Sequence, residues 1–166
     1  EPVSYPVGGE VTNPQEFARR REEIVIETAR DITALPINVL KAEFPADLKY
    51  NKDKTSLLKL CRELDKTSQV PWVLLSAGVD IDSFCTMVEI ACEGGASGFL
   101  GGRAIWQEVM PMTDRAKRIE YYHSTVAARF QRLNDIVRKH GKPWYRKYGN
   151  SITELAQGSE DWYQKY

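Results

Sequence analysis

The stretch Ile37–Pro45, which reads Ile-Asn-Val-Leu-Lys-Ala-Glu-Phe-Pro, decides how the fold can be interpreted. Its apolar and β-branched residues predict a short buried strand, and Pro45 closes it because proline cannot donate to a strand ladder. Side chains alternate between the two faces of a strand. We therefore expect Lys41 and Glu43 on one face and their apolar neighbours on the other.

A lysine in the middle of such a strand is costly unless chemistry uses its amine. Burial disfavours the charged ammonium form, so a neutral and nucleophilic amine becomes available at Lys41. The alternative is that Lys41 belongs to an edge strand and extends its ammonium group into water. This strand alone favours neither interpretation.

Further strands and helices follow at a regular rhythm. Helical periodicity or strand character is found in Ser56–Thr67 (helix), Trp72–Leu75 (strand), Ile81–Gly94 (helix), Ser97–Leu100 (strand) and roughly Thr113–His140 (helix). This alternation predicts parallel βαβ units and therefore an α/β fold. The chain contains no Gly-x-Gly-x-x-Gly motif, so a dinucleotide-binding fold is not indicated.

One more helix precedes these units. Asn13, Pro14 and Glu16 form a helix start, with a capping side chain, a proline in the first turn and an acidic third residue. We expect Phe17, Ile24 and Thr28 on the buried face of this helix. The run Arg19–Arg21 is expected on its solvated face, which is the commoner role of such a run than a phosphate site.

Composition excludes several classes of protein. The 166 residues predict one domain with a real core, and 23 Lys and Arg balance 23 Asp and Glu at a pI of about 7.0. That balance argues against a nucleic-acid partner, and no apolar run approaches the roughly 20 residues of a membrane span. The three cysteines lack Cys-x-x-Cys spacing, which indicates buried free thiols in a reducing cytoplasm and gives a metal site little support.

Small residues follow two of the expected strands. Ser76, Ala77 and Gly78 come after the strand at Trp72–Leu75, and Gly101, Gly102 and Arg103 come after the strand ending at Leu100. Parallel α/β proteins place their sites at these carboxyl ends, where backbone N–H groups can approach an anion and arginine can bind phosphate oxygens in pairs. Each loop alone could equally be a tight turn.

These segments together resemble a known family. The residues Lys41-Ala42-Glu43, Leu75-Ser76-Ala77-Gly78-Val79 and Gly98–Trp106 are similar to the last three barrel strands of class I tagatose-1,6-bisphosphate aldolases and of the related sulfofructose-phosphate aldolases. Glu1-Pro2 is similar to the glutamate-proline pair that ends the strand before them. The resemblance covers roughly residues 1–106.

The resemblance implies a mechanism without metal or cofactor. Lys41 would form a Schiff base with the ketose carbonyl, Glu1 would transfer protons near that imine, and Glu43 would help to set the protonation of Lys41. Ser76, Gly78, Gly102 and Arg103 would hold the phosphate or sulfonate end of the sugar. The iminium would supply the electrophile that zinc supplies in class II enzymes.

The resemblance also implies an incomplete barrel. A (β/α)8 TIM barrel needs about 250 residues and eight strands, so residues 1–140 would be its C-terminal half and residues 141–166 a tail whose aromatic residues dock on it. Since the chain supplies three strands and the end of a fourth, we expect either a fragment of a longer chain or a homo-oligomer that completes the barrel. No signal peptide is found, and the start at Glu1 without a methionine fits a missing N-terminus. No membrane association is expected.

Two other functions remain open from the sequence. One is a different phosphate-binding barrel enzyme, such as a sugar-phosphate isomerase or a decarboxylating synthase, which would share the loops but not need Lys41. The other is a non-catalytic module that binds a phosphometabolite or a partner chain.

Overall fold

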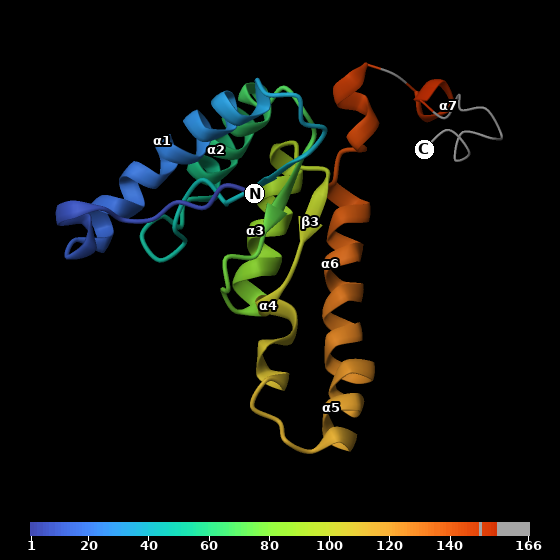
Figure 1. The fold of residues 1–166 in the computed structure, drawn as a ribbon. Helices are drawn as coiled ribbons and strands as arrows, with labels where there is room; N and C mark the ends of the chain where they lie inside the picture. Colours follow the sequence, from blue (N-terminus) through green and yellow to red (C-terminus); the bar gives the residue numbers. More distant parts are fainter. Residues whose placement is uncertain (150, 156–166) are drawn as a thin grey trace.

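The computed structural model describes residues 1–149 and 151–155 and has an α/β fold (Figure 1). Short 3-10 helices lie at Gly8–Val11, Gln107–Val109 and Trp144–Tyr148. The strands are β1 (Leu40–Ala42), β2 (Trp72–Leu75) and β3 (Gly98–Leu100). The α-helices are α1 (Pro14–Thr33), α2 (Lys54–Thr67), α3 (Ile81–Gly94), α4 (Arg103–Trp106), α5 (Arg115–Tyr121), α6 (Ala127–His140) and α7 (Ile152–Leu155).

Within the described residues, the three strands form one parallel sheet in the order β1-β2-β3. This confirms the predicted parallel βαβ units, and the predicted bounds of β2 and α3 agree with the structure. β1 is shorter than predicted because its ladder starts only where the Leu40 amide donates to the carbonyl oxygen of Pro71. β1 and β3 are therefore the edges of the sheet.

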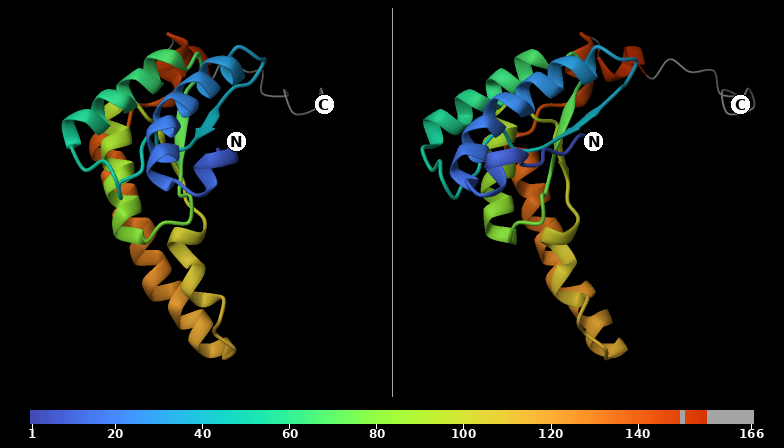
Figure 2. Two further views of the ribbon diagram at one scale, coloured as in Figure 1. Left: turned by 90° about the vertical axis from the view of Figure 1, so that its left-hand side faces the viewer. Right: turned by 60° about the vertical axis from the view of Figure 1, so that its left-hand side comes forward.

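The helices cover one face of the sheet (Figure 2). Ala42, Leu74 and Phe99 are paired in register across the three strands. On this face the Phe99 ring lies 5.9 Å from Phe84 of α3 and 6.4 Å from Phe130 of α6, measured between ring centroids. The core therefore lies between the sheet and the layer of α1, α2, α3 and α6.

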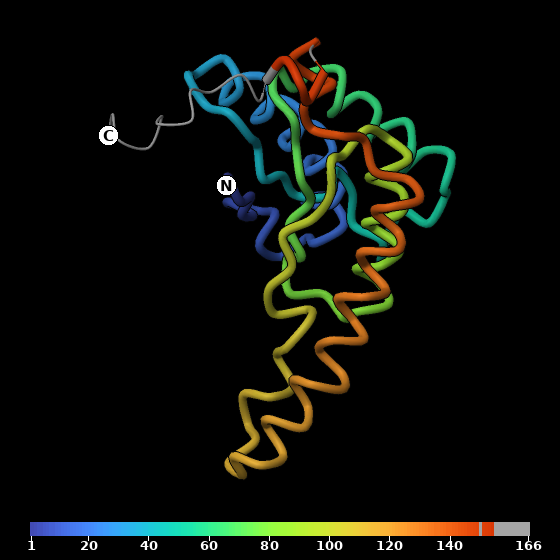
Figure 3. The backbone as a smooth tube through the Cα atoms, turned by 90° about the vertical axis from the view of Figure 1, so that its right-hand side faces the viewer, coloured from blue at the N-terminus to red at the C-terminus, as the bar shows by residue number. Residues whose placement is uncertain are grey.

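The opposite face of the sheet carries fewer neighbours, and we call it the open face. It presents Lys41 paired with Val73, and Leu75 paired with Leu100. Lys41 and Val73 are half-buried and Leu100 is 53% exposed, whereas Leu75 is buried. The tube in Figure 3 shows the same asymmetry, with the helices on one side of the strands.

The buried face of α1 differs from the prediction. Its buried residues are Ala18, Val25, Ile26, Ala29 and Thr33. Phe17, Ile24 and Thr28 are only half-buried. The predicted stripe was thus displaced by about one residue around the helix. As a result Arg21, which was expected in solvent, turns inward, and only 16% of its side chain is exposed.

The long helix predicted at Thr113–His140 begins at Arg115, with Asp114 as its N-cap. It runs as α5, a π-helical turn (Tyr122–Val126) and α6. The first part of this helix and the segment after α4 project beyond the sheet as a helical hairpin (Figure 1). In the described part of the chain, no helix is both long enough and apolar enough to cross a membrane.

The segment after α6 crosses the amino ends of the strands. The Tyr148 hydroxyl donates to the carbonyl oxygen of Asn38, the Lys147 ammonium donates to Asp65, and the Lys142 amide donates to Ala96. Trp162 and Tyr163, which were expected to dock on the body, lie outside the described residues. The three cysteines are free and buried, as predicted.

Candidate active site

Lys41 lies on the open face of edge strand β1, and its ammonium is directed at Glu1. The Lys41 Nζ atom donates to Glu1 Oε2 at 2.6 Å, and 27% of the lysine side chain is exposed. Lys41 is thus in an edge strand, as the alternative interpretation supposed, but its charge has a carboxylate partner. The structure brings together an amine and a proton-accepting group that are 40 residues apart in the chain.

Glu43 does not share the face of Lys41, and this expectation was wrong. β1 ends at Ala42, so the alternation of a strand does not continue to Glu43. The Glu43 carboxylate instead lies towards α1, where Oε1 accepts from Arg21 Nη2 at 2.8 Å. Its Oε2 accepts from the Ser4 amide at 2.8 Å and from the Ser4 hydroxyl at 2.6 Å.

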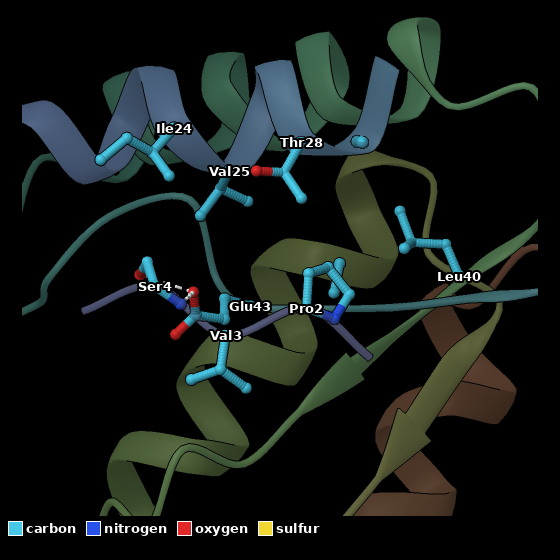
Figure 4. A pocket seen from close by; sticks show the side chains of 10 residues that line it. Pro2, Val3, Ser4, Ile24, Val25, Thr28, Leu40 and Glu43 are labelled. Atoms are coloured by element: carbon cyan, nitrogen blue, oxygen red, sulfur yellow. Dashed lines mark hydrogen bonds between the residues drawn. The ribbon is translucent and has the colours of Figure 1, made fainter. Parts of the chain in front are cut away.

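A small cavity of about 70 Å³ lies between α1 and the first residues of the chain (Figure 4). Ile24, Val25 and Thr28 line it from α1, and Pro2 and Val3 line it from the opposite side. Glu43 and Ser4 meet at one end of it. Residues 1–4 therefore run beside β1, held to it at Lys41 and at Glu43.

Ser76, Ala77 and Gly78 form a strained turn directly after β2. The Val79 amide donates to the carbonyl oxygen of Ser76 at 3.2 Å, and both central residues are left-handed, with φ of +49° at Ala77 and +74° at Gly78. An alanine in this region costs roughly 1–2 kcal/mol, and such strain concentrates at ligand-binding loops.

Arg103 lies against this turn from the end of β3. A Cβ atom at Gly78 would stand 3.4 Å from Cζ of the Arg103 guanidinium, and the Gly102 amide donates to Ser76 Oγ at 3.4 Å. A Cβ atom at Gly102 would meet nothing within 4 Å. The two loops thus meet as the sequence predicted, with a guanidinium and open backbone on one side.

Gly101 has a different role from Gly102. A Cβ atom at Gly101 would stand 2.4 Å from Cδ1 of the buried Ile105. Gly101 therefore permits α4 to pack closely behind the loop, which places Arg103.

The predicted site residues thus form two groups. Lys41 and Glu1 are on the open face of β1, and the residues of the two loops are at the carboxyl ends of β2 and β3. Neighbouring strands are about 4.8 Å apart, so one ligand some 10 Å long can contact both groups. The arrangement can hold an anionic group at one end of a ligand and present an amine to a carbonyl at the other.

A cluster of metal-binding residue types lies elsewhere, between α2, α3 and α6. Ligand atoms of Glu89, Glu93 and His140 are within 4.8 Å of one another. The Lys54 ammonium stands 3.4 Å from Glu89 and 3.3 Å from Glu93, and these carboxylates raise the pKa of Lys54. Lys54 thus supplies the positive charge that a metal ion would, so this is an ion-paired surface cluster.

Arg21 is the residue that the sequence interpretation missed. Helical spacing contained a signal for it, because Arg21 is three residues after the buried Ala18 and four before the buried Val25. A charged residue at that position of a buried stripe indicates a buried partner. The partner, Glu43, is 22 residues away and follows the Lys41 strand.

Comparison with known proteins identifies the family of the chain. The family model "DeoC/LacD family aldolase" matches residues 6–108. Tagatose 1,6-diphosphate aldolase 1 of Enterococcus faecalis is 25% identical over 84% of the chain and 47% of that relative, and the Lactococcus lactis enzyme is 27% identical over 80% and 45%. The Listeria monocytogenes (serotype 4a) enzyme is 24% identical over 90% and 49%. The chain spans about half the length of these curated relatives, and it belongs to the DeoC/LacD aldolase family.

Proposed function

We propose that the chain carries the reactive lysine of a class I aldolase that cleaves a ketose phosphate, such as tagatose 1,6-bisphosphate or sulfofructose 1-phosphate, to dihydroxyacetone phosphate and an aldehyde. The observation that carries this proposal is the 2.6 Å contact between Lys41 Nζ and Glu1 Oε2 on the open face of the sheet. Family membership and relatives named as tagatose 1,6-diphosphate aldolases support it.

The contact suits the proton transfers of Schiff-base chemistry. Glu1 accepts a proton from the Lys41 ammonium, and the neutral amine attacks the ketone carbonyl to give a carbinolamine. Glu1 returns this proton to the carbinolamine hydroxyl, which leaves as water and gives an iminium. Glu1 then takes the proton of the β-hydroxyl as the bond between the α- and β-carbons breaks. The bonding electrons pass to the iminium nitrogen, the aldehyde leaves, and Glu1 returns its proton to the enamine carbon. Hydrolysis of the iminium returns Lys41 and releases dihydroxyacetone phosphate.

The strand-end loops are proposed to hold the charged end of the sugar. Arg103 can offer two parallel N–H groups to phosphate or sulfonate oxygens. The Gly102 backbone is open on one side, and the turn of Ser76, Ala77 and Gly78 forms the opposite wall. Glu43 acts on the Lys41 site indirectly, because its carboxylate accepts hydrogen bonds from Ser4 and Arg21.

The sheet is proposed to be the C-terminal half of a (β/α)8 barrel. In a barrel the helices lie outside and the other face of the strands lines the interior, which corresponds to the helix-covered face and the open face of this sheet. Residues 1–140 would form this half and residues 141–166 the tail. A longer polypeptide or a second copy would complete it, and the free cysteines fit a reducing compartment such as the cytoplasm.

Borohydride trapping tests the proposal. In the intact protein, dihydroxyacetone phosphate and borohydride should add one covalent label, and peptide mapping should locate it on Lys41. Lys41→Arg should abolish both labelling and cleavage because guanidinium does not lose its proton to attack a carbonyl. Lys59→Arg, on the exposed side of α2, is the matched control and should be labelled normally.

The outcomes separate the functions. Labelling at another lysine, or full activity of Lys41→Arg, contradicts the mechanism. Phosphosugar turnover without trapping indicates a different phosphate-binding barrel enzyme. Phosphosugar binding with neither trapping nor turnover indicates a non-catalytic module.

A further inference from the structure

The Glu43 carboxylate joins three parts of the chain. Only 7% of its side chain is exposed, and it accepts three hydrogen bonds: one from Arg21 of α1, and two from Ser4, through the amide and the hydroxyl. Glu43 itself directly follows β1. Figure 4 shows the Ser4–Glu43 contact at the end of the cavity beneath α1.

This junction sets the position of Glu1. Ser4 is three residues after Glu1, and Glu43 is two residues after Lys41. Since the Ser4 backbone amide is itself a donor to Glu43, the bond determines how residues 1–4 align along β1. In that alignment the Glu1 carboxylate reaches the Lys41 ammonium.

Stability is a weak explanation for Arg21. Burying an ion pair costs desolvation that often cancels its attraction. In the described part of the chain, Arg21 Nε is a buried side-chain nitrogen without a hydrogen-bond partner, and such a group adds a further cost. An arginine that is incompletely satisfied is better explained by what it holds in place.

We propose that Arg21 is a positioning residue that acts through Glu43 and Ser4 to keep Glu1 at Lys41, an inference that rests on the proposed function for its catalytic meaning. Arg21 fixes the orientation of the Glu43 carboxylate from the helix side. Glu43 then holds Ser4 from the strand side. Helix α1 therefore determines, through Arg21, the position of Glu1 relative to Lys41.

The adjacent residue provides a matched control. Arg20 is on the same helix and pairs with Glu10, whose side chain is 6% exposed, much like that of Glu43. Glu10 lies in the 3-10 helix Gly8–Val11, away from β1. Arg20→Gln therefore removes an ion pair to an equally buried glutamate, although Arg20 itself is 54% exposed, and it does so without the link to Lys41.

Zero-length cross-linking tests the positioning without requiring activity. A carbodiimide should join the Glu1 carboxylate to the Lys41 amine as an amide, detected by mass spectrometry of the intact protein. Arg21→Gln should reduce this cross-link about tenfold, the loss expected for one charged hydrogen bond. Ser4→Ala, which removes one hydroxyl and should leave the fold intact, should reduce it measurably, whereas Arg20→Gln should not. An unchanged cross-link in Arg21→Gln or Ser4→Ala overturns the proposal.

Kinetics then test the catalytic meaning. Arg21→Gln should lower kcat with little change in KM, Arg21→Lys should restore part of it, and neither Arg21→Gln nor Ser4→Ala should lower kcat further in a Glu1→Gln background. Equal losses in Arg20→Gln and Arg21→Gln, or losses that add to that of Glu1→Gln, overturn the positioning role. Absence of Lys41 trapping in the unmodified protein refutes the proposed function instead, while the cross-link still decides the positioning.

Discussion

Arg129 of α6 binds Glu108 through two hydrogen bonds of 2.8 Å, one from each terminal nitrogen of the guanidinium. The same guanidinium donates to the carbonyl oxygen of Ile105 at the end of α4. Because α4 begins at Arg103, this contact holds the loop after β3 against the long helix. The proposed anion-binding arginine is therefore anchored from behind by a second arginine.

The Arg129–Glu108 pair should make the free energy of unfolding depend on pH in the acidic range. Hydrogen bonds from Arg129 lower the pKa of Glu108 to about 2. Since this pKa is lower than in the unfolded chain, the pair stabilises the fold fully above the ordinary glutamate range and loses its effect as pH falls towards 2. Glu108 is 44% exposed, so we expect less than about 1 kcal/mol at neutral pH.

Melting curves of Glu108→Gln against the unmodified protein would check this. The difference in Tm should be present at neutral pH and shrink as the pH is lowered through the acidic range. Glu120→Gln, an exposed position in α5, is the control and should show no such trend. A difference that is constant with pH would contradict the assignment.

Arg103→Ala should weaken binding of charged ligands selectively. Loss of a charged hydrogen-bonding partner costs on the order of 2–3 kcal/mol. Calorimetry with dihydroxyacetone phosphate should show this loss, while trapping of uncharged dihydroxyacetone at Lys41 should persist. Arg115→Ala in α5 should change neither. Equal losses for charged and uncharged ligands would make Arg103 a structural residue.

Gly101→Ala should destabilise the fold by overpacking. The new methyl group would stand 2.4 Å from Cδ1 of the fully buried Ile105, and such overpacking costs about 1–3 kcal/mol. Ile105→Val removes that Cδ1 atom and should recover part of the loss in the double variant. Urea unfolding of the unmodified protein, the two single variants and the double variant gives the coupling free energy between the two positions. Purely additive changes in the free energy of unfolding would disprove the contact.

The 166-residue chain should associate in solution. Its sheet has edges at β1 and β3, and the open face presents Leu100 at 53% exposure, with Val39 just before β1 at 50%. Such a surface favours association. Sedimentation should show a species larger than a monomer, and Leu100→Lys should reduce it more than Met110→Lys, whose position on the projecting hairpin is 71% exposed. A well-folded monomer with a cooperative melt would refute the half-barrel.

Local patterns predicted most of the fold. The predicted bounds of β2 and α3 match the structure. A short apolar run defines β2, and a capped amphipathic stretch defines α3, so neither depends on distant residues. The start of α2 was predicted two residues late. The lysines and aspartates before Ser56 resemble a loop in composition, but Asp53 caps the helix by accepting hydrogen bonds from the Thr55 and Ser56 amides.

The candidate site was less predictable because it depends on distant pairings. The turn at Ser76 and the approach of Arg103 followed from strand ends in a parallel sheet. The direction of the Glu43 side chain could not be predicted in this way. β1 ends at Ala42, so the alternation of faces does not extend to Glu43, and the ion pair with Arg21 determines where its carboxylate points. Proximity of Glu1 to Lys41 was implied only by resemblance to a family.

The segment after α6 forms hydrogen bonds that stabilise the scaffold at a distance from the candidate site. Lys142 and Tyr148 fasten Ala96 and Asn38, which precede β3 and β1 at the amino ends of these strands, and Lys147 fastens Asp65 in the last turn of α2, which leads into β2. The candidate chemistry lies at the carboxyl ends and on the open face. Substitutions at open positions of these loops, such as Gly102, can therefore accumulate without loosening the frame, so an evolving or engineered variant can change the ligand that it binds while keeping the same scaffold.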